Sequence, residues 1–253
     1  MRFASCTAVV TGGSRGIGAA VARALAAEGA AVVVAARSSE NIESIADEIR
    51  RKRGKAWAVP CDVTDRASVY GLAAAATRQA GPIDILVNSA GIAHSARLVK
   101  IALEDWNRLL AVNATGTFLC TQAFVPSMLS RKRGAIVNVA SIAGLFGARY
   151  IAAYAAAKHA VIGFTRSVAV ELEGSGVTCS AVCPGYVDTE MTRQSVARVA
   201  VQTGKSPEAS LEAMLAAAGQ KRLITPEEVA DAILSLAALE GSRPNGAELT
   251  ITG

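Results

Sequence analysis

A serine, a tyrosine and a lysine stand close together in the stretch SIAGLFGARYIAAYAAAK, residues 141–158. Lys158 follows Tyr154 by four residues, so the two side chains share one face of a helix. Reduction of a carbonyl group places negative charge on its oxygen, which then needs a proton from an acid. A nearby ammonium would lower the pKa of Tyr154 toward neutrality and make it that acid. Ser141 would hydrogen-bond the same oxygen.

Short apolar runs rich in β-branched residues alternate with alanine-rich helical stretches along the whole chain. Continuous apolar strands of this kind are typical of parallel sheets that are buried on both faces. The pattern predicts one α/β domain over residues 1–253: a doubly wound Rossmann fold with a seven-stranded, mostly parallel sheet and helices on both faces. Ser141 ends the fifth run, at the carboxyl edge where such sheets bind ligands.

The composition argues against several classes of protein. The net charge is only +5, and the two basic clusters at 50–53 and 131–133 are typical of solvated helix ends, so nucleic acid is not expected. The sequence shows no signal peptide and no run of about 18 apolar residues, which predicts a cytoplasmic protein without membrane contact. Five cysteines without a C-x-x-C pair predict small buried residues, with no disulfide framework and no metal site.

A glycine-rich turn, TGGSRGIG at residues 11–18, lies between the first apolar run and a helical stretch. Glycines in such a turn let the backbone approach a pyrophosphate, and the free N–H groups of the helix start attract its charge. The strand and helix around the turn make it a better indication of a dinucleotide site than the glycines alone.

With this turn the chain resembles the short-chain dehydrogenase/reductase family. Further motifs agree in order: CDV at 61–63, NSAG at 88–91, Asn113, Ser141, YAAAK at 154–158 and PGYVDT at 184–189. The resemblance covers residues 7 to about 250 and is closest in look to 3-oxoacyl thioester and polyketide ketoreductases. It implies reduction of a ketone to a secondary alcohol with a nicotinamide cofactor.

The resemblance assigns roles to individual residues. Ser141, Tyr154 and Lys158 would be catalytic, with Asn113 holding a water that passes protons to Lys158. Lys158 would also hold the nicotinamide ribose, and Thr189 the carboxamide. The full set of expected cofactor-binding residues is Gly12, Ser14, Arg15, Gly16, Ile17, Gly18, Arg37, Asp62, Val63, Asn88, Ala90, Gly91, Tyr154, Lys158, Pro184, Gly185, Val187 and Thr189.

The end of the second apolar run indicates which nicotinamide cofactor is used. An NAD-preferring site has an acidic residue there that binds the ribose 2′-hydroxyl, but this chain has Ala36 followed by Arg37. A guanidinium binds a phosphate through two parallel hydrogen bonds, and Arg15 in the glycine-rich turn would reach the same phosphate. The sequence therefore predicts NADPH in preference to NADH.

The substrate side is less defined. A lid-like segment at about 190–222 is rich in Ala, Val and Met, which suits an elongated apolar substrate. A thioester of acyl carrier protein, a thioester of coenzyme A and a polyketide-like free ketone all stay open. Residues 131–133 would suit an acidic carrier protein, whereas ELEGSG at 171–176 would not. Expected substrate residues are His94, Phe146, Arg149, Tyr150, Tyr186 and Met191.

Two alternatives remain at this stage. One is a dehydrogenase that oxidises a secondary alcohol or a 3-hydroxyacyl-coenzyme A, because both directions share one transition state. The other is a non-catalytic dinucleotide-binding regulator, which loss of Ser141, Tyr154 or Lys158 would favour, and all three are present. Family members usually form tetramers, so the resemblance implies a homotetramer that pairs the helices at about 106–130 and 154–173 across a two-fold axis.

Overall fold

Seven strands form one sheet in the computed structural model, which describes residues 1–239 and 244–253. Their order is β3-β2-β1-β4-β5-β6-β7, so the chain winds outward from β1 in both directions. The predicted doubly wound fold is confirmed, and every strand pair is parallel. The strands are β1 (Thr7–Thr11), β2 (Ala31–Ala36), β3 (Lys55–Pro60), β4 (Ile85–Asn88), β5 (Gly134–Val139), β6 (Val177–Pro184) and β7 (Glu248–Ile251).

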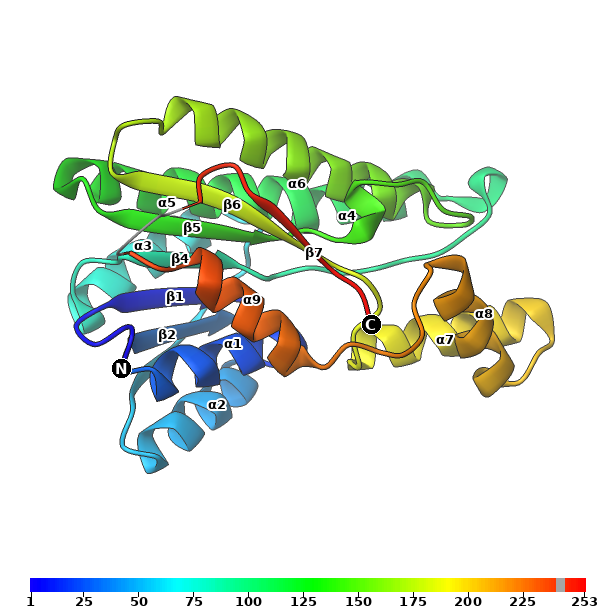
Figure 1. Ribbon diagram of the computed structural model, residues 1–253, viewed down its shortest axis with the longest axis horizontal. Helices are drawn as coiled ribbons and strands as arrows, with labels where there is room; N and C mark the ends of the chain where they lie inside the picture. Colours follow the sequence, from blue (N-terminus) through cyan, green and yellow to red (C-terminus); the bar gives the residue numbers. More distant parts are fainter. Residues whose placement is uncertain (240–243) are drawn as a thin grey trace.

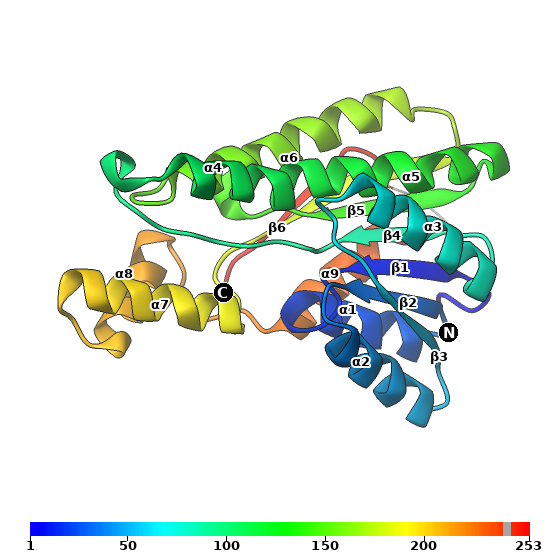
Figure 2. The same ribbon diagram turned by 180° about the vertical axis from the view of Figure 1, so that it is seen from behind.

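Helices cover both faces of the sheet (Figures 1 and 2). On one face lie α1 (Gly16–Ala27), α2 (Ser39–Arg51) and α9 (Pro226–Leu236). On the other lie α3 (Arg66–Ala80), α4 (Leu103–Leu110), α5 (Gly116–Arg131) and α6 (Ala152–Glu171). Between these layers and beyond them are the short turns η1 (Leu98–Lys100), η2 (Ala111–Thr115) and η3 (Ile142–Gly144), and the helices α7 (Glu190–Thr203) and α8 (Pro207–Ala217).

Each strand contributes alternate residues to two separate cores. Ala8 and Val10 of β1 pack in the core under α1, α2 and α9, whereas Val9 between them packs in the core under α3 and α5. Burial on both faces explains why these strands read as continuous apolar runs. The five cysteines are all buried, as their small apolar character predicts.

The longest helical run, Leu103–Arg131, joins α4, η2 and α5. By length and composition it could cross a membrane, which differs from the expectation that no run would qualify. Its most apolar window has a mean hydropathy of 1.2, and 44% of that window is buried in the protein. Because α4 packs on α6 and α5 on α3, we assign the run to a helical layer of the α/β fold.

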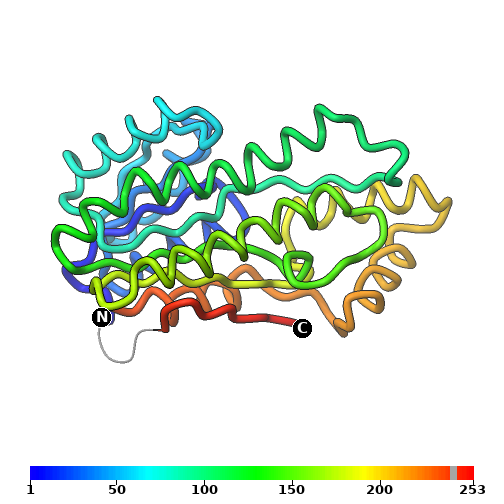
Figure 3. Tube along the Cα trace, turned by 90° about the horizontal axis from the view of Figure 1, so that it is seen from above, coloured from blue at the N-terminus to red at the C-terminus, as the bar shows by residue number. Residues whose placement is uncertain are grey.

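The carboxyl ends of the strands meet at one edge of the sheet, and α7 and α8 lie beyond that edge (Figures 1 and 3). Side-chain caps fix where these helices begin: Thr189 caps α7 and Ser206 caps α8. Thr225 and Glu228 form a capping box at the start of α9.

Candidate active site

Ser141, Tyr154 and Lys158 converge where β5 ends and α6 begins. Ser141 follows the carboxyl end of β5, and Tyr154 and Lys158 lie one turn apart on α6. The Lys158 Nζ lies 5.8 Å from the centre of the Tyr154 ring and donates a 2.8 Å hydrogen bond to the Val139 carbonyl. The Ser141 hydroxyl donates to the Pro184 carbonyl at 3.4 Å. The structure thus brings together the three side chains whose spacing predicts carbonyl chemistry.

Burial controls the protonation of the two titratable groups in this cluster. It raises the pKa of Tyr154 to about 12, while the Ser141 hydroxyl acts in the opposite direction. It lowers the pKa of Lys158 to about 8, because the ammonium loses its water. The expected fall of the Tyr154 pKa toward neutrality is therefore wrong for the protein alone, since loss of solvation outweighs the hydrogen bond with Ser141. Tyr154 is held as a neutral phenol, the form that donates a proton.

Asn113 fixes the loop that follows β4. It lies in the π-helical turn η2, and its Oδ1 accepts the Ile92 N–H at 3.1 Å. Its Nδ2 donates to the Ile92 and Leu109 carbonyls at 3.0 and 2.9 Å. A Cβ at Gly91 would lie 2.8 Å from Asn113 Oδ1 and 3.7 Å from Lys158 Nζ, so glycine is required between them. The side chain positions this loop, and its role in holding a water stays a prediction.

A buried chain of amides and hydroxyls joins the elements beneath the cluster. Asn88 Nδ2 donates to Asn138 Oδ1 at 2.9 Å and to Thr121 Oγ1 at 3.1 Å. Asn138 Nδ2 donates to Thr165 Oγ1 at 2.9 Å, so the chain runs from α5 through β4 and β5 to α6. It ties Asn88 to the helix that carries Tyr154. Sequence reasoning missed Asn138 and Thr165, although an amide inside the apolar run AIVNVAS signals a buried hydrogen-bond partner.

The turn between β1 and α1 fits a dinucleotide pyrophosphate. Gly12 has a φ of +66°, and a Cβ there would lie 2.7 Å from Ala90 Cα, so the turn packs directly on the loop after β4. The first turn of α1 has no acidic residue, and no side chain in the described part of the chain caps its N–H groups. These groups therefore remain available to an anion. On its far side the turn meets the start of α7, since a Cβ at Gly16 would lie 3.2 Å from Thr189 Cγ2.

The ends of β2 and β3 lie beside this turn. The Gly13 N–H of the turn donates to the Ala35 carbonyl of β2. Arg37 follows β2 and is exposed, as is Arg15 at the start of α1. Asp62 follows β3, and hydrogen bonds from Thr64 lower its pKa, with a smaller contribution from the charge of Arg37. The expected adenine and phosphate residues thus stand at neighbouring strand ends. Among the other expected cofactor residues, the half-buried ones are Ser14, Ile17 and Gly185, and the buried ones are Gly18, Val63, Pro184 and Val187.

Comparisons with known proteins agree with this arrangement, because residues 6–200 match the family described as short chain dehydrogenase. The chain belongs to the short-chain dehydrogenase family. It is 38% identical over 253 residues to a 3-oxoacyl-[acyl-carrier-protein] reductase of Thermotoga maritima, covering 100% of this chain and 98% of the relative. It is 34% identical over 250 residues to a D-beta-hydroxybutyrate dehydrogenase of Rhizobium meliloti, covering 98% and 97% of the two chains.

Solved structures give the same result for this short-chain dehydrogenase. A variant of actinorhodin polyketide ketoreductase with NADPH matches with a TM-score of 0.92 at 34% identity, covering 98% of this chain and 96% of the other. The predicted family and its class of reaction, oxidoreduction between an alcohol and a carbonyl group, are therefore confirmed.

The expected substrate residues of this dehydrogenase fall into two groups. Half-buried Tyr186 is close enough to act electrostatically on Tyr154, and half-buried His94 lies 3.6 Å from Asp105 Oδ2. A hydrogen bond of 2.8 Å from the Ala96 N–H to the Tyr150 carbonyl joins the loops after β4 and β5. The second group, on the exposed part of the loop after β5, comprises Phe146, Arg149 and Tyr150. Met191 belongs to neither group and is half-buried in the first turn of α7.

Segment 190–222 folds as α7 and α8 and is anchored to the active-site edge. Gln220 accepts the Tyr186 N–H at 2.7 Å and donates to the Tyr186 carbonyl at 3.3 Å. A Cβ at Gly185 would collide with Gln220, so the two segments are in direct contact. Arg198 of α7 donates to the Ala93 carbonyl at 3.4 Å. Sequence reasoning identified neither Gln220, after the end of α8, nor Arg198 of α7, because an isolated polar residue carries no pattern.

The basic cluster at 131–133 lies at the opposite edge of the sheet. Arg131 Nη1 is 2.6 Å and Arg133 Nε is 3.5 Å from Asp84 Oδ1. Asp84 is buried just before β4 and also accepts the Thr7 N–H at 3.1 Å. The interpretation of this cluster as a solvated helix end is therefore corrected for Arg131 and Arg133, and their pairing also makes them less available to a carrier protein. Two of its arginines neutralise a buried carboxylate.

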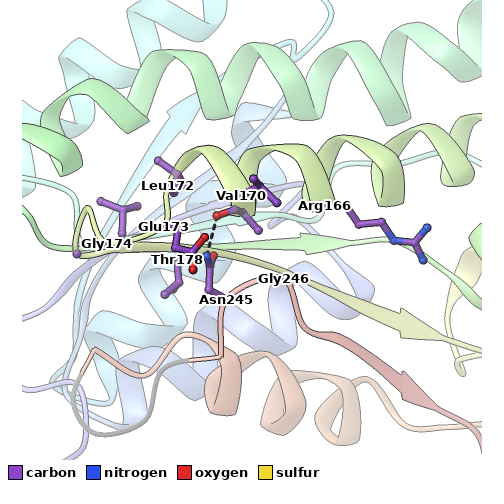
Figure 4. A pocket seen from close by; sticks show the side chains of 11 residues that line it. Arg166, Val170, Leu172, Glu173, Gly174, Thr178, Asn245 and Gly246 are labelled. Carbon is purple, nitrogen blue, oxygen red and sulfur yellow. Dashed lines mark hydrogen bonds between the residues drawn. The ribbon is translucent and has the colours of Figure 1, made fainter.

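A hollow of about 750 Å³ opens at this amino edge, between the end of α6 and the start of β6 (Figure 4). Asn245 and Ala169 both line the hollow, and Asn245 Nδ2 donates to the Ala169 carbonyl at 2.7 Å. Arg166 at its rim is paired with Glu248 at 2.6 Å. No predicted catalytic, cofactor or substrate residue lines the hollow, so it is separate from the candidate active site.

Proposed function

We propose that the protein reduces a ketone to a secondary alcohol with NADPH as the cofactor. The observation that carries this proposal is the convergence of Ser141, Tyr154 and Lys158 at the edge that also holds the glycine-rich turn. Tyr154 donates its proton to the oxygen as negative charge develops there, and Ser141 holds that oxygen by a hydrogen bond. The ammonium of Lys158 stabilises the phenolate that remains. The dinucleotide, when bound, supplies the hydride.

The proposed substrate is a 3-oxoacyl thioester, carried by acyl carrier protein or by coenzyme A, or a polyketide-like ketone. The names of the Thermotoga relative and of the actinorhodin enzyme support this class. Segment 190–222 would act as its lid. If a carrier protein docks, it would not use Arg131 and Arg133, because both pair with Asp84 at the far edge of the sheet.

We also propose a cytoplasmic homotetramer that pairs α5 and α6 with their copies. Phe118 of α5 is 42% exposed and Val170 of α6 is 74% exposed, which is unusual for large apolar side chains on neighbouring helices. Phe118 and Phe164 pack edge to face with ring centres 6.1 Å apart, so an apolar contact joins the two helices. A partner helix would bury it.

The cofactor preference rests on Arg15 and Arg37 together with the absence of an acid at Ala36. We expect a titration at physiological salt to give tighter binding of NADPH than of NADH. Ala36→Asp combined with Arg37→Ala should change the ratio of the two affinities more than tenfold, because each charged hydrogen bond contributes roughly 1.5–3 kcal/mol. Arg51→Ala, at the other end of α2, is the matched control. Equal binding of the two cofactors by the unmodified protein would show that this assignment is wrong.

An alternative is a dehydrogenase that oxidises a secondary alcohol, as the name of the Rhizobium relative indicates for that protein. Oxidation needs a phenolate to accept the alcohol proton, whereas burial raises the pKa of Tyr154 to about 12. Because both directions share one transition state, this pKa does not decide between them, and kinetic measurement does. A panel of ketones and their alcohols, measured with NADPH, NADP+, NADH and NAD+ at pH 7, separates the two directions. Faster alcohol oxidation throughout the panel would contradict the proposal.

A further inference from the structure

Arg198 of α7 is a half-buried cation without a carboxylate partner among the described residues. Its Nη2 donates to the Ala93 carbonyl at 3.4 Å and to the Ser195 hydroxyl at 3.3 Å, and both distances are long. Its Nε is buried and has no hydrogen-bond partner in the described chain. A guanidinium has five N–H donors, so most of its hydrogen-bonding capacity is unused.

A second arginine on the same helix shows the opposite arrangement. Arg193 is exposed, yet it pairs with Asp188 at 2.7 Å and with Glu190 at 3.4 Å. The more buried arginine is the one that needs compensation, because removing a charge from water without pairing it is costly. An anion that comes from outside the chain would supply this compensation for Arg198.

The position of Arg198 points to an anion on the substrate. Met191, Ser195 and Arg198 share one face of α7 by their spacing of four and three residues. The contact of Arg198 with Ala93 turns this face toward the loop after β4. Ala93 is two residues from Gly91, so the Cα atoms of the two residues are at most about 7 Å apart. Gly91 adjoins Lys158, so the guanidinium lies on the catalytic side of α7.

We propose that Arg198 binds an anionic oxygen group of the substrate, a carboxylate or a phosphate, while the ketone lies at Tyr154. This inference rests on the proposed function and narrows its substrates to carbonyl compounds that carry an acid group. The Ala93 carbonyl and the Ser195 hydroxyl are neutral acceptors that hold the guanidinium in place without cancelling its charge. A planar guanidinium can then bind the anion through two parallel hydrogen bonds.

Two matched pairs of substrates test the proposal and separate the sources of the anion. Acetoacetate and its methyl ester differ in the carboxylate. Acetoacetyl-coenzyme A carries phosphates, together with the pantothenate and adenosine parts of the coenzyme, that acetoacetyl-N-acetylcysteamine lacks. Arg198→Met should lower kcat/KM for the anionic member of at least one pair by tenfold or more, and leave its neutral partner within about twofold. Arg198→Lys should recover part of the loss, and Arg193→Met, the control on the same helix, should change neither pair.

The outcomes distinguish this inference from the proposed function. Equal losses for both members of each pair, or no loss in either pair, would overturn the role of Arg198 while leaving ketone reduction intact. If the wild type reduces none of the four compounds, the proposed function fails on these substrates, and calorimetric titrations of acetoacetate and acetoacetyl-coenzyme A decide on Arg198 alone. Weaker binding of one of them by Arg198→Met would then support the anion site, and equal binding of both would contradict it.

Discussion

The two edges of the sheet differ in whether their buried charges are paired within the chain. At the amino edge, Asp84 is bound by Arg131 and Arg133 and by a backbone N–H. At the carboxyl edge, the ammonium of Lys158 is buried and donates a hydrogen bond to one backbone carbonyl, and Arg198 has no carboxylate partner among the described residues. Charges that only support the fold are paired within the chain, whereas charges at the proposed active site are left for a ligand.

This difference has an energetic meaning. A buried ion pair that loses one member leaves an uncompensated charge and destabilises the protein strongly. A buried cation without a counter-ion already carries that cost in the native state, as the lowered pKa of Lys158 indicates. We infer that the protein tolerates the unpaired cations because the chemistry at the carboxyl edge needs them, so substitutions at the two edges should have opposite effects on stability.

The largest expected effect is on turnover. Tyr154→Phe removes the proton donor but keeps the ring, so turnover of a ketone should fall by at least about 10², the lower range for general acid catalysis. Cofactor affinity and the unfolding temperature should change little. Tyr70→Phe, at the exposed face of α3, is the control and should leave turnover unchanged. Turnover of Tyr154→Phe near the wild-type rate would remove Tyr154 from the mechanism.

Removing the paired carboxylate at the other edge should destabilise the fold. Asp84→Ala leaves two arginines facing each other without their counter-ion, and we expect a loss of about 3 kcal/mol in the free energy of unfolding, measured in urea. Activity per folded molecule should stay close to that of the wild type. The exposed pair of Arg166 and Glu248 is the control, and Glu248→Gln should cost less than about 1 kcal/mol. Equal effects of the two substitutions would show that Asp84 is not a structural charge.

The pH dependence of reduction should follow the protonation of Lys158. Its pKa of about 8 means that the ammonium is present at pH 7 and is lost as the pH rises through 8. The neutral phenol of Tyr154 persists to a higher pH, because its pKa is about 12. We therefore expect kcat/KM for reduction to be flat from pH 6 to about pH 7 and to decrease roughly tenfold per pH unit above about pH 8. A profile that stays flat to pH 10 would contradict this assignment.

The sequence predicted the fold and the catalytic cluster well, since both depend on local patterns. Apolar runs defined the strands, and the spacing of Tyr154 and Lys158 placed both on one face of α6. The pKa of Tyr154 was predicted wrongly, because spacing gives the distance of a charge but not the loss of water around it. Arg198 and Asn138 were missed since their partners, at Ala93 and Asn88, are distant in the chain. Arg131 was predicted to be solvated for the same reason, because its partner Asp84 is 47 residues away in the sequence.

The most direct test of the difference between the two edges is the unfolding free energy of Lys158→Met at pH 7, with turnover measured on the same sample. Removing an ammonium that is charged but desolvated in the folded state should raise stability by about 1–3 kcal/mol and abolish most turnover. The sign follows from linkage: between pH 8 and 10.5 the unfolded wild type binds the proton that the folded one lacks, so wild-type stability rises with pH and the gain from the substitution shrinks. Loss of stability at pH 7, or turnover close to that of the wild type, would contradict the conclusion that this edge keeps an unpaired cation for catalysis.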